Sequence, residues 1–170
     1  ILAADLTSLP VELVIARGMV VAERGRLVVD IPAFAYPEAA RRTMHMKRAV
    51  TARDFDITAP AGRNQVDVRV IGVIENQAPT KALQKTLKVE SGLVEMDRVN
   101  DVCQIALVER HKATGKVVNA FVSGFGYSKD CALASTVAHD SHHMIVVGTN
   151  KDDMAQAANI LKDIGGGLVL

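Results

Sequence analysis

The chain has 170 residues, 49% hydrophobic and 4% aromatic, without Trp, so its core is expected to be aliphatic and its length fits one domain, with or without a piece of another. Its 20 basic and 19 acidic residues give a net charge of +1, which offers no electrostatic reason to expect nucleic acid or an anionic membrane as a partner. No apolar run approaches the roughly 18 residues of a membrane span, and no signal peptide opens the chain.

The first part of the chain predicts short β-strands. We expect strands at Val11–Ala16, 19–22 and 27–30, separated by turns at the glycines between them. Three short strands cannot bury a core by themselves. They therefore pack on later parts of the chain, or they end a domain that begins upstream. The chain opens on Ile1 instead of Met, which favours a segment of a longer protein.

A linker is expected next, because Pro32 and Pro37 prevent regular strand pairing. Residues 38–42 predict a short helical turn. Further on, Thr51 predicts an N-cap, with Asp54 three residues later.

The chain from residue 65 predicts a run of strands. They are expected at 65–75, 81–89, 102–109 and 117–122, the last two joined as an antiparallel hairpin by a polar loop that contains His111. Residues 81–89 also fit a short helix, but the strand is favoured. His111, in that loop, and His45, in the basic stretch at residues 43–49, are both expected to be solvated.

A C-terminal helix is expected after Asn150, a suitable N-cap, with Asp152 and Asp153 in the first turn. The glycines at 165–167 end this helix. Its apolar face is expected to consist of Met154, Ala157, Ala158, Leu161 and Ile164.

The elements together predict an α+β fold. A mixed, mostly antiparallel sheet carries the packed C-terminal helix and is preceded by a few strands of a small β domain. The expected division is between residues 1–42, with the early strands and linker, and residues 43–170.

The candidate functional site is the segment His139, Asp140, Ser141 and His142, followed by His143. Histidine clusters suit proton transfer, metal binding or base recognition, and a dense polar cluster between apolar segments is not expected to be a solvated face. If the segment is extended, alternate side chains share a face. If it is a turn, Asp140 and Ser141 bind nearby amides and present the histidines outward. The competing interpretation is a purely structural contact.

The cysteines offer little chemistry. Cys103 and Cys131 are the only two, no CxxC exists, and isolated thiols are typical of a buried, reduced, intracellular protein. A zinc site using Cys131, His139 and His142 is conceivable, but this spacing matches no recurring structural zinc pattern.

An ordered series of motifs resembles one known family. Gly124-Phe125-Gly126 is followed by ALASTVAHDSH at 132–142, IVVG at 145–148, DMA at 153–155 and GGGL at 165–168. This series resembles the C-terminal domain of bacterial adenine deaminase, in the amidohydrolase superfamily. VELVIARG at 11–18 and DIP at 30–32 resemble the last strands of the composite β domain before it. One departure is visible, since the family pattern has Asn where this chain has His143.

The resemblance implies a metal-dependent hydrolase that converts adenine and water to hypoxanthine and ammonia in purine salvage and adenine catabolism. It implies a cytoplasmic homo-oligomer whose manganese or iron is bound by an upstream TIM barrel. No ligand set of that barrel is present here, so this chain is expected to bind no metal and to be catalytically incomplete by itself.

Two other classes of function stay open. One is a noncatalytic module that binds a purine or a metal with the 139–142 segment, and the other is a structural domain that mediates oligomerisation. Within the enzyme, the segment either closes over the barrel mouth to contact the purine or forms an interdomain or subunit contact.

Overall fold

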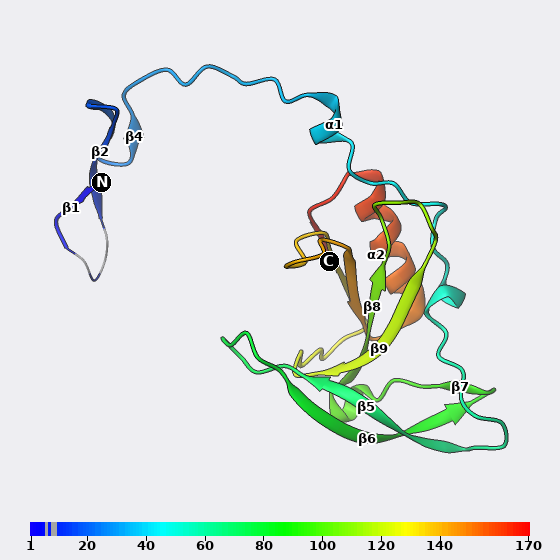
Figure 1. Ribbon diagram of the computed structural model, residues 1–170. Coiled ribbons are helices and arrows are strands. Elements are labelled where there is room, and N and C mark those ends of the chain that lie inside the picture. The colour runs from blue at the N-terminus through cyan, green and yellow to red at the C-terminus, as the bar shows by residue number, and fades with distance from the viewer. Residues whose placement is uncertain (6, 8–9) are drawn as a thin grey trace. The chain divides into compact units, whose positions relative to one another are not determined.

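The computed structural model describes residues 1–5, 7 and 10–170, in two compact units, Ile1–Pro37 and Glu38–Leu170 (Figure 1). The sequence placed the domain boundary slightly later, between residues 42 and 43. That position lies just after the short helix α1 (Glu38–Arg41), which was expected at 38–42.

The first unit is one small antiparallel sheet. Its strands pair in the order β1 (Leu2–Ala3), β2 (Val11–Ala16), β3 (Met19–Glu23) and β4 (Arg26–Leu27). The expected strand at 27–30 is wrong in extent, because regular pairing ends at Leu27 and only the amide of Val28 continues it, to the carbonyl of Val21. Every described residue of this unit stays at least partly exposed, as expected for strands that cannot form a core alone.

The second unit is built on an eight-stranded sheet. Its spatial order is β12-β10-β11-β8-β9-β5-β6-β7, and every pair is antiparallel except the short parallel pairing of β5 with β9. The strands are β5 (Gln65–Gly72), β6 (Lys81–Glu90), β7 (Leu93–Val94), β8 (Val102–Val108), β9 (Val117–Ser123), β10 (Ala132–Ser135), β11 (Met144–Gly148) and β12 (Leu168–Val169). The α+β fold with a mostly antiparallel sheet is therefore confirmed.

Helix α2 (Lys151–Asp163) packs on one face of this sheet (Figure 1). Asn150 caps it by accepting the amide of Asp153 at 2.8 Å, as its sequence predicts. Gly148, just before the helix, has no room for a Cβ, because one would lie 2.5 Å from Met154. The main core forms between helix and sheet, from Met154, Ala155, Ala157, Ala158 and Leu161 against Ala106, Val108, Ala132, Ala134, Met144 and Val146.

The chain enters this core through the segment before the short 3-10 helix η1 (Ala52–Phe55). Thr51 and Asp54 form the predicted cap, with the Thr51 amide donating to the Asp54 carboxylate at 2.7 Å. Arg48 donates hydrogen bonds to that carboxylate, and they hold the pKa of Asp54 well below its usual range. Asn159 of α2 bonds both the amide and the carbonyl of Val50, at 3.0 and 2.8 Å.

Sequence patterns predicted most elements and missed others. The strand over 81–89 is confirmed as β6, against the helical alternative. The strand expected at 65–75 ends at Gly72, and a turn follows in which the amide of Gln77 binds the carbonyl of Ile74 and Asn76 has a left-handed φ. Ile164 was wrongly placed on the buried helix face and is 60% exposed. The short β1, β7 and 3-10 helix η2 (Arg98–Asn100) were not predicted. Across the described residues, no helix is long and apolar enough to cross a bilayer.

We predict that Leu161→Ala lowers the free energy of unfolding by about 2–5 kcal/mol, because it leaves a cavity in the core under α2. Ile164→Ala is the matched control and should change it by less than about 1 kcal/mol, since Ile164 is mainly in solvent. Urea denaturation followed by circular dichroism measures both. Equal losses in the two variants would contradict the helix orientation.

Candidate functional site

The segment 139–143 forms a turn between β10 and β11, so the extended alternative is excluded. The amide of Ser141 donates to the carbonyl of His139 at 3.0 Å, and that of His142 to the carbonyl of Ala138 at 2.9 Å. Asp140 and His142 have φ values of 67° and 49°. Positive φ is uncommon for residues with a β-carbon, but aspartate and histidine are both found in this left-handed region more often than most residues.

His139 and Asp140 project from this turn as a pair of contacting side chains. The Nδ1 of His139 lies 2.9 Å from Oδ1 of Asp140, and both side chains are almost fully exposed. The expectation that this cluster is not a solvated face is therefore wrong for these two residues in this chain. Because both side chains are in water, this contact contributes little to stability. It leaves the Nε2 of His139 free to meet another molecule.

Ser141 supports the turn from within. Its hydroxyl accepts the amide of His143 at 3.4 Å, as the turn hypothesis expected. Asp140 behaves differently from that hypothesis, because its carboxylate pairs with the ring of His139 instead of a backbone amide. His142 is exposed and is held through its backbone.

Arg110, a residue that sequence reasoning did not single out, anchors this backbone. It is buried, and its Nε donates to the carbonyl of His142 at 2.7 Å. Its Nη1 donates to the carbonyl of Thr43 at 2.8 Å. Burial lowers the pKa of Arg110 below its usual value, but an arginine stays protonated. One buried cation therefore ties the turn to the segment that enters this unit.

His111 is exposed, as expected, but it also contacts the turn, which the sequence did not predict. Its Nε2 lies 2.9 Å from the carbonyl of Ser141, and its ring centroid lies 4.9 Å from that of His143. The Nδ1 of His143 is buried and has no hydrogen-bond partner. His45 is exposed, as expected, and its amide binds the carbonyl of Arg110 at 2.7 Å.

The glycine pair of Gly124-Phe125-Gly126 serves a local structural purpose. The amides of Gly124 and Gly126 donate to the carboxylate of Asp101 at 2.6 and 2.8 Å. Both glycines have positive φ, which turns their amides toward one anion. Because Asp101 already fills this nest, the pair is not an open site for a substrate anion.

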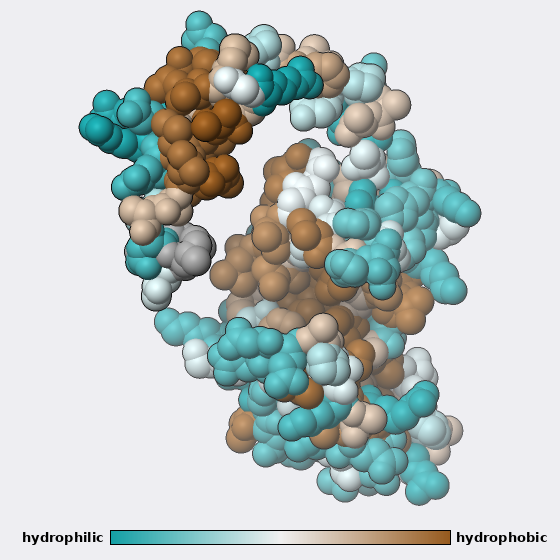
Figure 2. Space-filling view, turned by 60° about the vertical axis from the view of Figure 1, so that its left-hand side comes forward, coloured by the Kyte–Doolittle hydropathy of each residue, from teal (hydrophilic) through white to brown (hydrophobic). Residues whose placement is uncertain are grey.

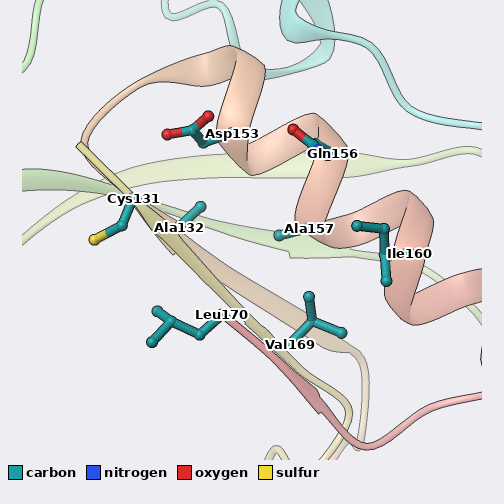
Figure 3. A pocket seen from close by; sticks show the side chains of 8 residues that line it. All are labelled: Cys131, Ala132, Asp153, Gln156, Ala157, Ile160, Val169 and Leu170. Atoms are coloured by element: carbon teal, nitrogen blue, oxygen red, sulfur yellow. The ribbon is translucent and has the colours of Figure 1, made fainter.

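A cavity of about 220 Å³ lies between α2, β10 and the edge strand β12. Figure 3 shows apolar Ala157, Ile160 and Val169 between helix and strands, with Asp153 and Gln156 on the helix. Asp153 is already engaged, since it accepts the side-chain amide of Asn150 at 2.6 Å. Residues at the start of β10 line this cavity, whereas the histidine turn follows the end of β10. The cavity and the turn are therefore separate features.

No metal centre is formed by the described part of the chain, which contains no group of three or more His, Cys, Asp or Glu side chains that could hold an ion. Cys131 precedes β10 and His139 follows it, so the strand separates the potential ligands. Burial raises the pKa of the Cys103 thiol to about 11, which makes it a poor ligand or nucleophile.

Comparison with known proteins identifies relatives along the whole chain. Residues 77–170 match the family described as adenine deaminase C-terminal domain. Adenine deaminase 3 of Rhizobium meliloti is 66% identical over 170 residues, and the adenine deaminase of Mesorhizobium japonicum is 61% identical over the same length. The adenine deaminase of Moorella thermoacetica is 46% identical over 165 residues, or 97% of this chain. The chain spans 28% of the length of each of these curated relatives.

We predict a pH-dependent hairpin loop beside the turn. The amides of Thr114, Lys112 and His111 and the Thr114 hydroxyl donate to Glu109, and these bonds lower its pKa from 4.5 to about 2. A depressed folded pKa stabilises the loop above pH 4.5, and this contribution is lost as the pH falls toward 2. Hydrogen exchange at Thr114 should therefore lose protection over that window. Glu109→Gln keeps one acceptor oxygen but no titratable group, so its protection should be weaker and independent of pH over this window; a titration at Thr114 that survives in this variant would contradict the assignment.

Proposed function

The chain belongs to the adenine deaminase C-terminal domain family, and from this membership we propose that it is part of an enzyme that deaminates adenine. The reaction adds water to the purine and releases hypoxanthine and ammonia. The observation that carries the proposal is 66% identity along the whole chain to a protein named adenine deaminase. The chain corresponds to 28% of that relative, so we assign the chemistry to the longer protein of which it is the C-terminal part.

We propose that the metal of the reaction, manganese or iron, is bound outside this segment, on a barrel domain of the longer chain. A catalytic metal site needs about three protein ligands and an open position for water. The described residues assemble no such set, and therefore they do not fit a catalytic metal. The same proposal makes the barrel a partner of this domain and adenine the substrate of the whole enzyme.

The turn 139–143 is the part of this chain that we propose contacts the purine. Hydrolytic deamination needs a proton delivered to a ring nitrogen, a proton taken from water, and donors and acceptors along the ring edge. The carboxylate of Asp140 is 2.9 Å from the Nδ1 of His139, which favours the proton on Nδ1 and leaves Nε2 as an outward acceptor. After protonation the same Nε2 becomes a donor. An oriented imidazole of this kind can accept or donate at the edge of a purine.

The support of the turn agrees with this role. Arg110 and His111 bind two of its carbonyls, those of His142 and Ser141. A polar group that contacts a substrate must be held in place by neighbouring bonds. Left-handed backbone at non-glycine residues is also frequent at functional turns, and the turn has it at Asp140 and His142.

For its setting we propose a cytoplasmic homo-oligomer that acts in purine salvage and adenine catabolism. Cys103 and Cys131 are free thiols, which are usual in a reducing compartment. Closed oligomers are common among soluble enzymes. Fractionation of cells and light scattering of the purified full-length protein test these two statements.

We predict that the purified 170-residue chain releases no ammonia from adenine, even with manganese or iron added, because it lacks a metal ligand set among its described residues. The full-length protein should release ammonia under the same conditions. A coupled ammonia assay measures both, with a heat-killed sample as the blank. Activity in the short chain, or none in the full-length protein, would contradict the proposed function.

We also predict that His139→Ala and Asp140→Ala lower the turnover of the full-length enzyme by about 100- to 1000-fold, the effect of losing one transition-state hydrogen bond. Their melting temperatures should stay close to the parent value, since both side chains are exposed in this chain. His45→Ala, another exposed histidine, is the matched control and should leave turnover unchanged. Near-normal turnover with a lower melting temperature would instead assign the turn to an interdomain or subunit contact.

A further inference from the structure

The face of the central sheet opposite α2 is apolar and only half covered. It carries Cys103, Ile105 and Leu107 of β8, which alternate with the α2-facing Ala106 and Val108. The register places Val122, Ala120 and Val118 of β9 beside them. On the other side Ile145 of β11 pairs with Leu107, and Leu133 of β10 pairs with Val147.

The covered half of this face lies under the loop after β9. Phe125 and Tyr127 of that loop pack with Cys103, Val122 and Val147, each of which is at most 2% exposed. Burial raises the pKa of the Tyr127 phenol to about 12. We define the remaining half as the open sheet face. It consists of Leu107, Val118, Ala120, Leu133 and Ser135, together with Ile105 and Ile145, which are partly exposed and also pack at the edge of the covered cluster.

The open sheet face has the composition of a buried surface. Six of its seven residues are apolar and none is charged, yet Leu107 is 39% and Val118 49% exposed. Figure 2 shows apolar side chains gathered on this unit beside polar loops and strand ends. An antiparallel sheet with one solvated face alternates apolar and polar residues, whereas β11 is apolar on both faces and β8 is apolar on both faces except for the buried Gln104. Such strands belong to the middle layer of a three-layer arrangement.

We propose that the open sheet face is covered by a segment of the longer adenine deaminase chain that lies outside these 170 residues. This inference rests on the proposed function, because it requires that longer chain. The match takes up 28% of the length of each relative, so most of such a longer chain is available to supply the covering segment. The surface is mainly apolar and carries no charged residue, so its occupant is an apolar face, such as an amphipathic helix packed as α2 is on the other side.

A segment of the same polypeptide is favoured over a second copy of the protein. A tethered segment is present at an effective concentration of about a millimolar, well above the usual concentration of a free second molecule. The open sheet face also has no charged residue that would select a particular foreign partner. Apolar area of this kind is stable in a soluble protein only when it is covered.

The test is thiol labelling of the full-length protein. Val118→Cys and Leu107→Cys place a small thiol on the open sheet face, and Gln84→Cys, on an exposed position of β6, is the matched control. Each variant is treated with N-ethylmaleimide in buffer and in urea, and peptide mass spectrometry resolves the labelled site. Hydroxyl-radical footprinting of Leu107 and Ile145 in the unmodified protein gives the same information without a substitution.

We expect thiols at 118 and 107 to react at least about 100-fold more slowly in buffer than in urea, with no dependence on protein concentration. The control thiol should react within about tenfold of its urea rate. Fast reaction at 118 and 107, with oxidation of both footprinted residues, would overturn the inference. Protection that disappears on dilution would also overturn it, in favour of a second copy. Adenine deamination by the same samples reports separately on the proposed function.

Discussion

The antiparallel pairing of β8 with β11 is the constraint on which the rest of the second unit depends. Its register sets Val108 opposite Met144. At this point the hairpin loop leaves the end of β8, and the histidine turn leads into the start of β11. Arg110 and His111 therefore extend from one strand just as His142 and Ser141 approach the other. The same register aligns Ala106 with Val146 under α2, so a slip by one residue would reverse the apolar faces and separate the turn from its anchors.

The fold was largely predictable because local patterns and tertiary packing agree in it. The alternation of β5, the cap at Asn150 and the glycines after α2 are each local signals, and the structure agrees with them. Ile164 shows the limit of such reasoning. It continues the helical period, but α2 ends at Asp163 and nothing packs over the next turn enough to bury it. The helical period predicts the side of the helix on which a residue lies, whereas burial of that residue also requires another element to pack against that side.

The candidate site was predictable only in part, because its members come together through register instead of proximity in sequence. His139, Asp140, Ser141 and His142 form a visible cluster in the sequence. Arg110 and His111 lie about thirty residues away, inside what looks like an ordinary polar loop. Their one signal is that both come shortly after the end of an apolar strand. This position indicates that Arg110 and His111 reach the turn only when it is known that β8 pairs with β11.

Asn159 gives the second unit a further property. Its side-chain amide bonds both the amide and the carbonyl of Val50, and these two bonds fasten the middle of α2 to the entering segment. Thr43, seven residues earlier in that segment, binds Arg110, which holds the carbonyl of His142. Helix, entering segment and turn are thus linked through Val50, Thr43 and Arg110, and we expect them to open together. A fluctuation that detaches α2 would loosen the turn as well, so the shape of the exposed histidine pair depends on a helix that does not touch it.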